Sequence, residues 1–227
     1  MKIQKIVQLY RLIVMLLFVL PLTSCGQKKE THNISEVFKQ EQKHKNVFQD
    51  VKQDTATFAA GCFWCVEEQF KQLKGVLSVT SGYTGGKTPN PDYEQVSAGT
   101  TGHAEACNII YDPSVISFKD LLEAFFTAHD PTQLNRQGND TGTQYRSAVF
   151  YHSEEQRELT LYYIKRLDEE KAFPRKIVTE IAPYKVFYKA EDYHQNYYEN
   201  NKDQQYCRFV IAPKLDKFRR AFKEKLR

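Results

Sequence analysis

From about residue 54 onward, the pattern of apolar and polar positions is that of a folded domain built from short strands and helices. Residues 55–59 have the composition of a strand that runs into Gly61. A helix over about residues 62–74 is expected next, because large apolar side chains recur at helical spacing until Gly75 stops the run. These apolar side chains are Phe63, Val66, Phe70 and Leu73.

The same patterns predict the remaining elements of the domain. Ser117 with Asp120, and Ser153 with Gln156, have the spacing of helix caps, which predicts helices to about residues 128 and 171. A turn of helix near residues 192–200 and a C-terminal helix after Pro213 are also expected, and the stretches 82–103 and 129–144 are read as long loops. Strands are expected at 76–81, 105–111, 147–152, 177–181, 186–188 and 207–211.

These elements alternate without a regular strand–helix–strand repeat, and the chain has no internal sequence repeat. Fold class α+β is therefore expected, as a two-layer sandwich in which helices pack on a mixed or antiparallel sheet.

The first 24 residues have a different pattern, a basic start followed by an apolar run from Leu12 to Leu22. A spanning helix needs about 20 apolar residues, so this run fits the apolar core of a secretory signal better. It ends in Leu22-Thr23-Ser24-Cys25-Gly26, which resembles a bacterial lipobox. We therefore expect residues 1–24 to be a lipoprotein signal peptide and Cys25 to carry the lipid, with an uncleaved N-terminal anchor as the alternative.

Residues 25–53 are polar and charged with only scattered apolar side chains, which predicts a tether between the lipid and a domain at 54–227. The protein is then an exported, membrane-anchored lipoprotein of a bacterial cell envelope. The formal net charge of +4 falls mostly on the signal, because Lys2, Lys5 and Arg11 lie there without an acidic residue. Without them the balance is close to neutral, so a nucleic-acid partner has no support.

Five cysteines are too few for a disulfide scaffold in 227 residues, and their odd number raises the question of what each one does. Cys62 and Cys65 lie three residues apart at the expected start of a helix. Unpaired backbone N–H groups and the helix dipole favour a thiolate there, and Cys65 lies one turn along the same face. The pair therefore indicates redox chemistry, and a zinc site is not expected because a second ligand pair is missing.

The sequence Gly61-Cys62-Phe63-Trp64 is accompanied by further motifs in a fixed order. They are Gly82-Tyr83-Thr84-Gly85-Gly86, Gly102-His103-Ala104-Glu105, Asp140-Thr141-Gly142-Thr143-Gln144-Tyr145-Arg146-Ser147 and Ala190-Glu191-Asp192-Tyr193-His194-Gln195. Together they resemble the A-type peptide methionine sulfoxide reductases from about residue 55 to 215. The resemblance implies a ferredoxin-like fold and repair of oxidised proteins by thiol-dependent reduction of methionine S-sulfoxide, protein-bound or free.

Reduction of a sulfoxide needs a thiolate, an acid that protonates the oxygen, and a grip on a small apolar group. Cys62 is the expected nucleophile by its helix-start position and its motif. Glu105 is the expected acid, because a carboxyl among aromatic rings keeps its proton at neutral pH. The wall against which the substrate methyl group packs is expected from Phe63 and Trp64.

Other roles rest on the resemblance alone. Tyr83 and Tyr145 are implied to hydrogen-bond the sulfoxide oxygen, Asp140 to hold that network, and Tyr193 to contact the substrate. His103 either orients the loop that bears Glu105 or is merely solvated, and the sequence favours the solvated state.

Attack on the sulfoxide leaves Cys62 as a sulfenic acid, which a second thiol must convert to an intramolecular disulfide. Most members of the family have Gly where this chain has Cys65, and a Gly-rich C-terminal tail with a resolving cysteine is absent here. Cys65 is thus the first candidate for the resolving thiol and Cys207 is its rival, while Cys107 is expected in the core.

The resemblance further implies no cofactor or metal, oxidised proteins as substrates, and electrons from an external thioredoxin-like dithiol; we expect a monomer. Two other functions remain open on the residues alone. The Cys62/Cys65 pair also fits a thioredoxin-like dithiol-disulfide exchanger, which would be indifferent to loss of Glu105. A non-catalytic surface binding module would be indifferent to loss of Cys62.

Overall fold

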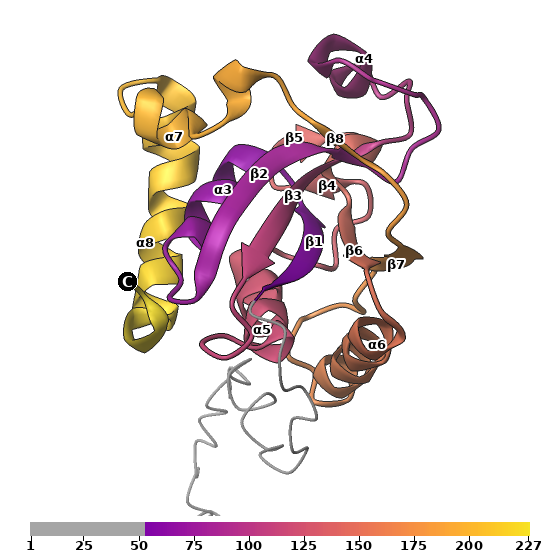
Figure 1. Cartoon of the computed structure of the whole chain (residues 1–227), viewed down its shortest axis with the longest axis vertical. Helices are drawn as coiled ribbons and strands as arrows, with labels where there is room; N and C mark the ends of the chain where they lie inside the picture. Colours follow the sequence, from indigo (N-terminus) through magenta and orange to yellow (C-terminus); the bar gives the residue numbers. More distant parts are fainter. Residues whose placement is uncertain (1–52) are drawn as a thin grey trace, which may run out of the picture. The chain divides into compact units, whose positions relative to one another are not determined.

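The computed structural model describes residues 53–227. The expected signal peptide, the lipidation site Cys25 and nearly all of the expected tether lie outside the described residues. The described part is an α+β unit in which helices lie against a mixed sheet, so the expected fold class is confirmed (Figure 1).

The main sheet has six strands in the order β7-β6-β1-β3-β2-β8, with β1 and β3 at its centre. Neighbouring strands are antiparallel except for the parallel pair β6 and β7. A separate two-stranded ladder pairs β4 with β5. The strands are β1 Asp54–Ala60, β2 Val76–Thr84, β3 Ala104–Tyr111, β4 Arg136–Gln137, β5 Asp140–Thr141, β6 Ser147–Tyr151, β7 Glu180–Pro183 and β8 Phe187–Lys189.

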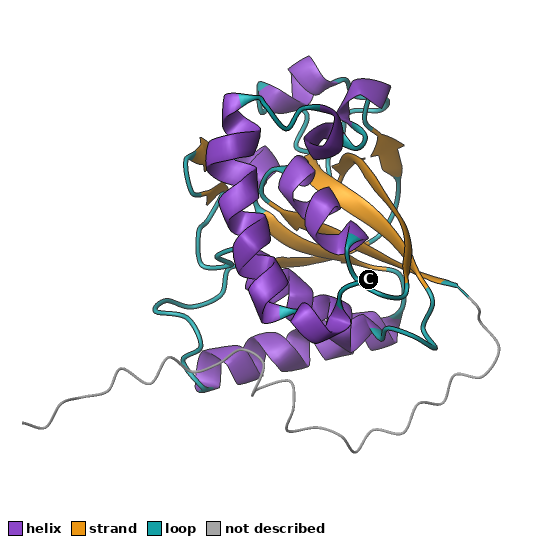
Figure 2. Cartoon of the chain, turned by 90° about the vertical axis from the view of Figure 1, so that its left-hand side faces the viewer, coloured by secondary structure: helices purple, strands orange, loops and turns teal. Residues whose placement is uncertain are grey.

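Helices α3, α5 and α8 contact one another, and α3 and α5 also contact the sheet (Figure 1, Figure 2). The α-helices are α3 Phe63–Lys71, α4 Tyr93–Ser97, α5 Phe118–Ala128, α6 Glu154–Glu169, α7 Tyr197–Asn200 and α8 Ala212–Ala221. Short 3-10 helices lie at Thr143–Tyr145, Asp192–His194 and Lys223–Lys225, and a π-helix at Cys207–Ile211 leads directly into α8.

Both expected helix caps are present. The Ser117 hydroxyl accepts from the Asp120 backbone N–H at 3.1 Å, and the Asp120 carboxylate accepts from the Ser117 backbone N–H at 3.0 Å, which forms a reciprocal capping box for α5. The Ser153 hydroxyl accepts from the Gln156 backbone N–H at 3.2 Å and so starts α6.

The core lies between the helices and the centre of the sheet. Phe58 on β1 is fully buried, and its ring centroid lies 5.7 Å from that of Phe70 on α3 and 4.9 Å from that of Phe125 on α5. One β1 side chain thus packs against both helices. Burial of an aromatic ring contributes about 2–3 kcal/mol to the free energy of unfolding. This packing holds α3 against the sheet.

Three local expectations were wrong. The stretch 82–103 is not one loop, because β2 continues to Thr84 and α4 begins after Asp92, whose carboxylate accepts from the Gln95 backbone N–H at 2.8 Å. Residues 129–144 contain the β4–β5 ladder. Cys207–Ile211 is helical rather than a strand, since a short apolar run cannot distinguish the two and the buried Cys207, Ile211 and Leu215 recur at helical spacing.

The strand expected at 177–181 begins only at Glu180. The preceding backbone is bound elsewhere, because the Ile177 N–H donates to the Asp168 carboxylate at 3.0 Å and the Val178 N–H donates to the Pro131 carbonyl at 2.9 Å. Among the described residues, no helix is both long and apolar enough to cross a bilayer.

Candidate active site

Cys62 lies between the end of β1 and the first turn of α3, at the helix N-cap, as the sequence predicted. Gly61 leads into this turn with a φ of +84°, and a Cβ there would lie 2.6 Å from the Cβ of Gln137. Only glycine fits a position with that backbone and that little space. The tight entry brings Cys62 under the surrounding loops, and its exposed fraction is 5%.

Cys65 lies one turn along α3 from Cys62, and both side chains belong to one apolar cluster with Cys207. Burial raises the pKa of the Cys62 thiol, and the hydrogen bond between the two thiols raises it further. The same hydrogen bond lowers the pKa of Cys65, and the ammonium of Lys214 adds to that effect. The Cys62 thiol is therefore harder to ionise than a free cysteine, and the Cys65 thiol is easier to ionise.

Burial thus opposes the thiolate that the helix start favours at Cys62. The dipole of a helix stabilises a nearby anion by about 0.3–1 kcal/mol at an exposed position, whereas removing a charge from water costs several kcal/mol. Burial is therefore the larger effect on the pKa of Cys62.

Glu105 lies on β3 directly beside the start of α3, and only 2% of its surface is exposed. Its carboxyl accepts from the Phe63 backbone N–H at 3.0 Å. Burial raises the pKa of Glu105 well above its ordinary range, and the nearby Cys62 raises it further. A carboxyl that keeps its proton at neutral pH can act as an acid, which agrees with the sequence expectation.

Aromatic rings surround Cys62 and Glu105 at the start of α3. Trp64 stacks on Tyr197 with ring centroids 3.7 Å apart, and its indole N–H donates to Nδ1 of His194 at 3.1 Å. Phe63 is buried, with its centroid 5.1 Å from that of His194 and 5.9 Å from that of Tyr83. Phe63 and Trp64 thus form one apolar wall whose outer layer comes from the segment after β8.

The tyrosines expected from the motifs occupy different positions. Tyr83 lies opposite Glu105 in the β2–β3 ladder, is fully buried, and donates its hydroxyl hydrogen to Glu191 at 2.8 Å. Tyr145 is half-buried, and burial followed by the electrostatic effects of Glu105, Tyr93 and Cys62 raises its pKa. Tyr193 is 61% exposed and packs on His194 at 4.1 Å between centroids.

Tyr93 belongs to this group, although the sequence analysis did not single it out. Burial raises the pKa of its phenol to about 12, and Glu105 and Cys62 contribute to the rise, which places the ring near both reacting groups. Its backbone N–H donates to the Glu191 carboxylate at 2.8 Å, the same carboxylate that accepts from Tyr83. The helix-cap signal of Asp92 was readable in the sequence, but nothing there relates Tyr93 to Glu105.

Asp140 is partly buried and accepts from the Tyr206 hydroxyl at 2.8 Å. Burial raises the pKa of Tyr206, and Cys62 and Cys65 raise it further, so the ring lies against both sulfurs. Tyr206 was missed at the sequence level, where only its neighbour Cys207 drew notice. Tyr206 thus lies between Asp140 and the cysteine pair and connects them.

The other two described cysteines differ in their surroundings. Cys107 is buried on β3 and donates to the Phe63 carbonyl at 3.5 Å, as expected of a core thiol. Cys207 is buried in the apolar cluster with Cys62, but no hydrogen bond joins their thiols. It begins the π-helix that precedes α8.

The solvated state favoured for His103 was wrong. The ring is buried, its Nδ1 accepts from the Gly86 backbone N–H at 3.0 Å, and its Nε2 lies 2.8 Å from the Thr88 carbonyl. The ring therefore joins the Gly-rich turn after β2 to the start of β3, and so orients the loop that leads into Glu105. A lone His in a loop gives no sign of such backbone contacts.

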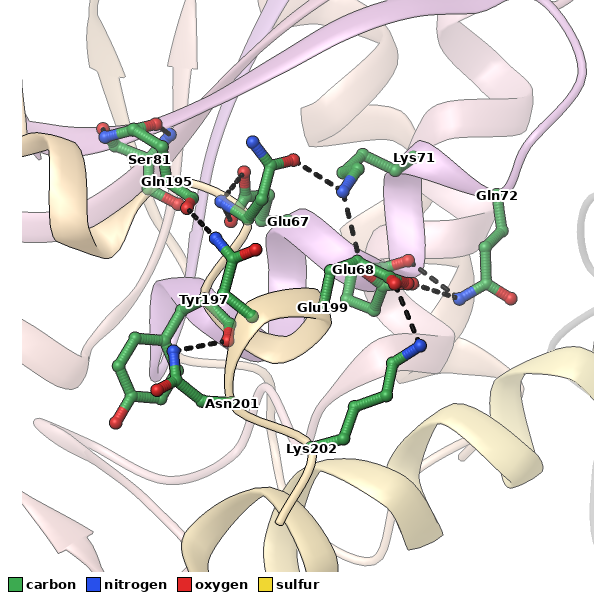
Figure 3. A network of polar contacts seen from close by, with 12 residues as sticks. Glu67, Glu68, Lys71, Gln72, Ser81, Gln195, Tyr197, Glu199, Asn201 and Lys202 are labelled. Carbon is green, nitrogen blue, oxygen red and sulfur yellow. Dashed lines mark hydrogen bonds and ion pairs between the residues drawn. The ribbon is translucent and has the colours of Figure 1, made fainter. Parts of the chain in front are cut away.

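The segment from Asp192 to Lys202, which includes α7, is held by side chains rather than by strand pairing (Figure 3). Gln195 accepts from the Ser81 N–H at 3.1 Å and donates to the Ser81 carbonyl at 3.0 Å, so its amide pairs with β2 as a strand would. The buried Glu67 accepts from the Asn196 N–H at 2.9 Å, and Lys71 donates to the Asn196 side chain at 2.7 Å. These bonds place His194 and Tyr197 over Trp64.

Within residues 53–227, His, Cys, Asp and Glu side chains form no group that could hold a metal ion. The chemistry that the site itself offers is that of two neighbouring thiols and one buried acid.

Comparison with known proteins agrees with this chemistry. The family model described as peptide methionine sulfoxide reductase matches residues 54–226. The peptide methionine sulfoxide reductase MsrA of Saccharolobus solfataricus is 52% identical over 174 residues, which are 77% of this chain and 97% of that protein. The MsrA of Deinococcus radiodurans is 55% identical over 175 residues, covering 77% and 85%.

Solved structures give the same result. The crystal structure of Mxr1 from Saccharomyces cerevisiae in reduced form superposes with a TM-score of 0.65 at 36% identity, covering 70% of this chain and 92% of that one. Methionine sulfoxide reductase A of Corynebacterium diphtheriae gives a TM-score of 0.60 at 37% identity, covering 67% and 76%. These matches decide against a thioredoxin-like exchanger and a non-catalytic binding module. The chain belongs to the peptide methionine sulfoxide reductase family and is an oxidoreductase of the MsrA type.

Proposed function

We propose that this MsrA reduces methionine S-sulfoxide, protein-bound or free, by a thiol route in which Cys62 attacks the sulfoxide and Glu105 protonates its oxygen. The observation that carries the proposal is a buried, protonated carboxyl beside a buried thiol, both at the N-terminus of α3. A dithiol exchanger has no oxygen to protonate, whereas a sulfoxide oxygen must gain protons before it leaves.

In the first half-reaction, the Cys62 sulfur forms a bond to the substrate as Glu105 gives its proton to the sulfoxide oxygen. The thiol proton of Cys62 passes to Glu105, so the carboxyl is again protonated when the half-reaction ends. The oxygen ends on Cys62 as a sulfenic acid, and the substrate sulfur is reduced to the thioether of methionine. Substrate oxygen and thiol proton thus account for the new S–OH group.

We assign recognition of the substrate to the aromatic wall and the tyrosines. The methyl group packs against Phe63 and Trp64, Tyr193 contacts the substrate, and Tyr83 and Tyr145 hydrogen-bond the oxygen within a network held by Asp140. For Tyr83 this requires its hydroxyl to leave Glu191, whereas Tyr93 and Tyr145 lie near Glu105 and Cys62. Tyr93 is therefore a second candidate for the role first given to Tyr83.

In the second half-reaction, Cys65 attacks the Cys62 sulfenic acid and an intramolecular disulfide forms with loss of water. The support for Cys65 over Cys207 is its hydrogen bond to Cys62 and its lowered pKa, since a thiolate is the attacking species. By contrast, burial raises the pKa of Cys207. An external thioredoxin-like dithiol then reduces the disulfide, so the enzyme needs no prosthetic group.

The test of the function uses a peptide that contains one methionine sulfoxide of known configuration. Purified protein with dithiothreitol should release methionine from the S epimer and leave the R epimer intact, and Cys62→Ser should abolish release. The proposal fails if the S epimer is untouched or if Cys62→Ser stays active. Reduction of insulin disulfides with indifference to Glu105→Ala would instead indicate the dithiol exchanger.

The test of the resolving thiol is the intact mass after one turnover without reductant. A Cys65→Ser variant should stop with one added oxygen, whereas a Cys207→Ser variant should reach the disulfide. A normal disulfide in Cys65→Ser would assign the role to Cys207.

We also propose a ferredoxin-like topology for the core, which rests on the chain order β1-α3-β2-β3-α5-β6 and the central sheet order β6-β1-β3-β2. For the cell, we propose an exported lipoprotein that acts as a monomer, with Cys25 lipidated and residues 1–24 removed. The support is the basic start, the short apolar run and the small residues before Cys25. Loss of membrane partitioning in Cys25→Ala tests the anchor.

A further inference from the structure

The first turn of α8 brings an ammonium group against the second cysteine of the pair. Nζ of Lys214 lies 3.8 Å from Sγ of Cys65, which is hydrogen-bond distance for a sulfur acceptor. The Lys214 side chain is half-buried, and within residues 53–227 it forms no ion pair with a carboxylate. Its charge is therefore directed at the sulfur rather than shared with an acid.

The position of Lys214 is fixed by the residues on either side of it. Ile211 and Leu215 are fully buried in the same cluster as Cys62 and Cys65. They hold the junction of the π-helix and α8 against the cysteine pair, and Figure 1 shows α8 running beside α3. A long flexible side chain on a fixed backbone loses less entropy on reaching its partner than one on a loop.

Among the described residues, ionisable groups from several elements face the Cys65 sulfur. Cys62 shares a hydrogen bond with it, Tyr206 lies against it, Asp140 opposes its negative charge, and Lys214 supports that charge. Because the Asp140 carboxylate accepts from the Tyr206 hydroxyl, part of its charge is already engaged. Lys214 is thus the cation of this group, and its ammonium lies against the Cys65 sulfur.

We propose that Lys214 is a catalytic residue of the second half-reaction, whose ammonium holds the Cys65 sulfur as the thiolate that attacks the Cys62 sulfenic acid. The same ammonium stabilises that sulfur when it becomes the leaving group during reduction by an external dithiol. This inference rests on the proposed function, in which Cys65 is the resolving thiol.

The steps balance in atoms and electrons. The Cys65 thiolate forms the S–S bond as the S–O bond of the Cys62 sulfenic acid breaks, and the oxygen leaves as water after gaining a proton from Glu105. Cys65 is oxidised and Cys62 is reduced in this step. The external dithiol thiolate then attacks Cys62, and the Cys65 thiolate leaves beside Lys214, which is faster the more stable the leaving thiolate is. The second thiol of the dithiol breaks the mixed disulfide, so the dithiol is oxidised and Cys62 is released, while Glu105 regains its proton from water.

The experiment compares full-length wild-type protein with Lys214→Met and Lys214→Arg in single turnovers without reductant. Rapid quenching and intact mass follow methionine release and disulfide formation separately. In Lys214→Met, disulfide formation should slow about 10-fold relative to methionine release, because the lost thiolate fraction is partly offset by a more basic, more nucleophilic sulfur. Its pH profile should move to higher pH, and Lys214→Arg should restore most of the rate.

Lys217→Met on the exposed face of α8 is the matched control and should behave as wild type. In a Cys65→Ser background, Lys214→Met should not change the decay of the sulfenic acid. An unshifted pH profile of disulfide formation, an equal slowing of both half-reactions, or an effect that persists without Cys65 would overturn the role of Lys214. Absence of methionine release from wild type would instead refute the proposed function, so the two failures are distinguishable.

Discussion

The two halves of the site are held by different forces. Cys62 and Glu105 lie where β1, β3 and α3 meet, so backbone ladders and the Phe58 core fix them. His194, Tyr197, Tyr206 and Lys214 come from residues 194–227. There, hydrogen bonds from Gln195 to β2 and from Asn196 to Glu67 of α3 replace strand pairing.

The difference matches what the two proposed half-reactions need. The nucleophile and the acid of the first step need fixed geometry, which a buried ladder provides. The second step needs Cys65 to reach Cys62 and the disulfide to meet an external dithiol, and the C-terminal segment covers that side through a few polar contacts. Segments held in this way open at lower free energy than core strands.

The largest expected effect is on the sheet side. Glu105→Gln keeps the size of the side chain and its bond to the Phe63 N–H but removes the acidic proton. Methionine release should fall about 10²- to 10³-fold, the usual range for a lost general acid. Single-turnover release measured from pH 6 to 9 checks this. A variant that retains more than a third of the wild-type rate at pH 7 would remove Glu105 from the mechanism.

Tyr206→Phe tests the residue that touches both halves. Its hydroxyl donates to Asp140 in this structure and also lies close enough to Cys62 to lower the pKa of that thiol against the effect of burial. Loss of a hydrogen bond to a charged group costs about 1.5–3 kcal/mol, so we expect methionine release to slow about 10-fold or more, with its pH profile moved to higher pH. Stopped-flow release over pH, with Tyr198→Phe as control, measures it. An unmoved profile would contradict the contact with Cys62.

Gln195→Ala tests the side-chain anchoring of the C-terminal segment. It removes the bonds to the Ser81 N–H, the Ser81 carbonyl and the Ala190 carbonyl, which should cost about 2 kcal/mol of unfolding free energy. Amide exchange should speed up in residues 190–202 and not in β1 or β3. Urea unfolding measures the free energy of unfolding and hydrogen exchange measures the local protection, with the exposed Gln204→Ala as control. Uniform loss of protection would show that the segment is no separate unit.

The smallest effect concerns the dependence of stability on pH. A buried Glu105 with a raised pKa binds its proton more tightly in the folded than in the unfolded chain, where its pKa is about 4.3. Its contribution is complete below that pH and is lost as pH rises toward the folded pKa. Glu105→Gln should therefore lose less stability than wild type between pH 5 and 8. Thermal unfolding, with the exposed Glu158→Gln as control, measures the difference in slope; parallel curves would count against a protonated Glu105.

Local signals in the sequence determined much of this protein. Helical spacing of Phe63, Val66 and Phe70 predicted α3, the Ser117 and Ser153 caps predicted α5 and α6, and Gly61 before Cys62 predicted the turn that holds the nucleophile. These features depend on residues within a few positions of one another, so they can be predicted without knowledge of the fold.

Contacts between distant parts of the chain decided the rest. How readily Cys65 ionises depends on Cys62, on burial and on Lys214, which lies 149 positions from Cys65, and no local pattern reports that last contact. Three other features also depend on contacts between distant parts of the chain. They are the burial of His103, the positions of Tyr93 and Tyr206 near the cysteine pair, and the helical state of Cys207–Ile211. The sequence supplied the thiols and the acid, while the removal of water by tertiary packing decided their protonation and their partners.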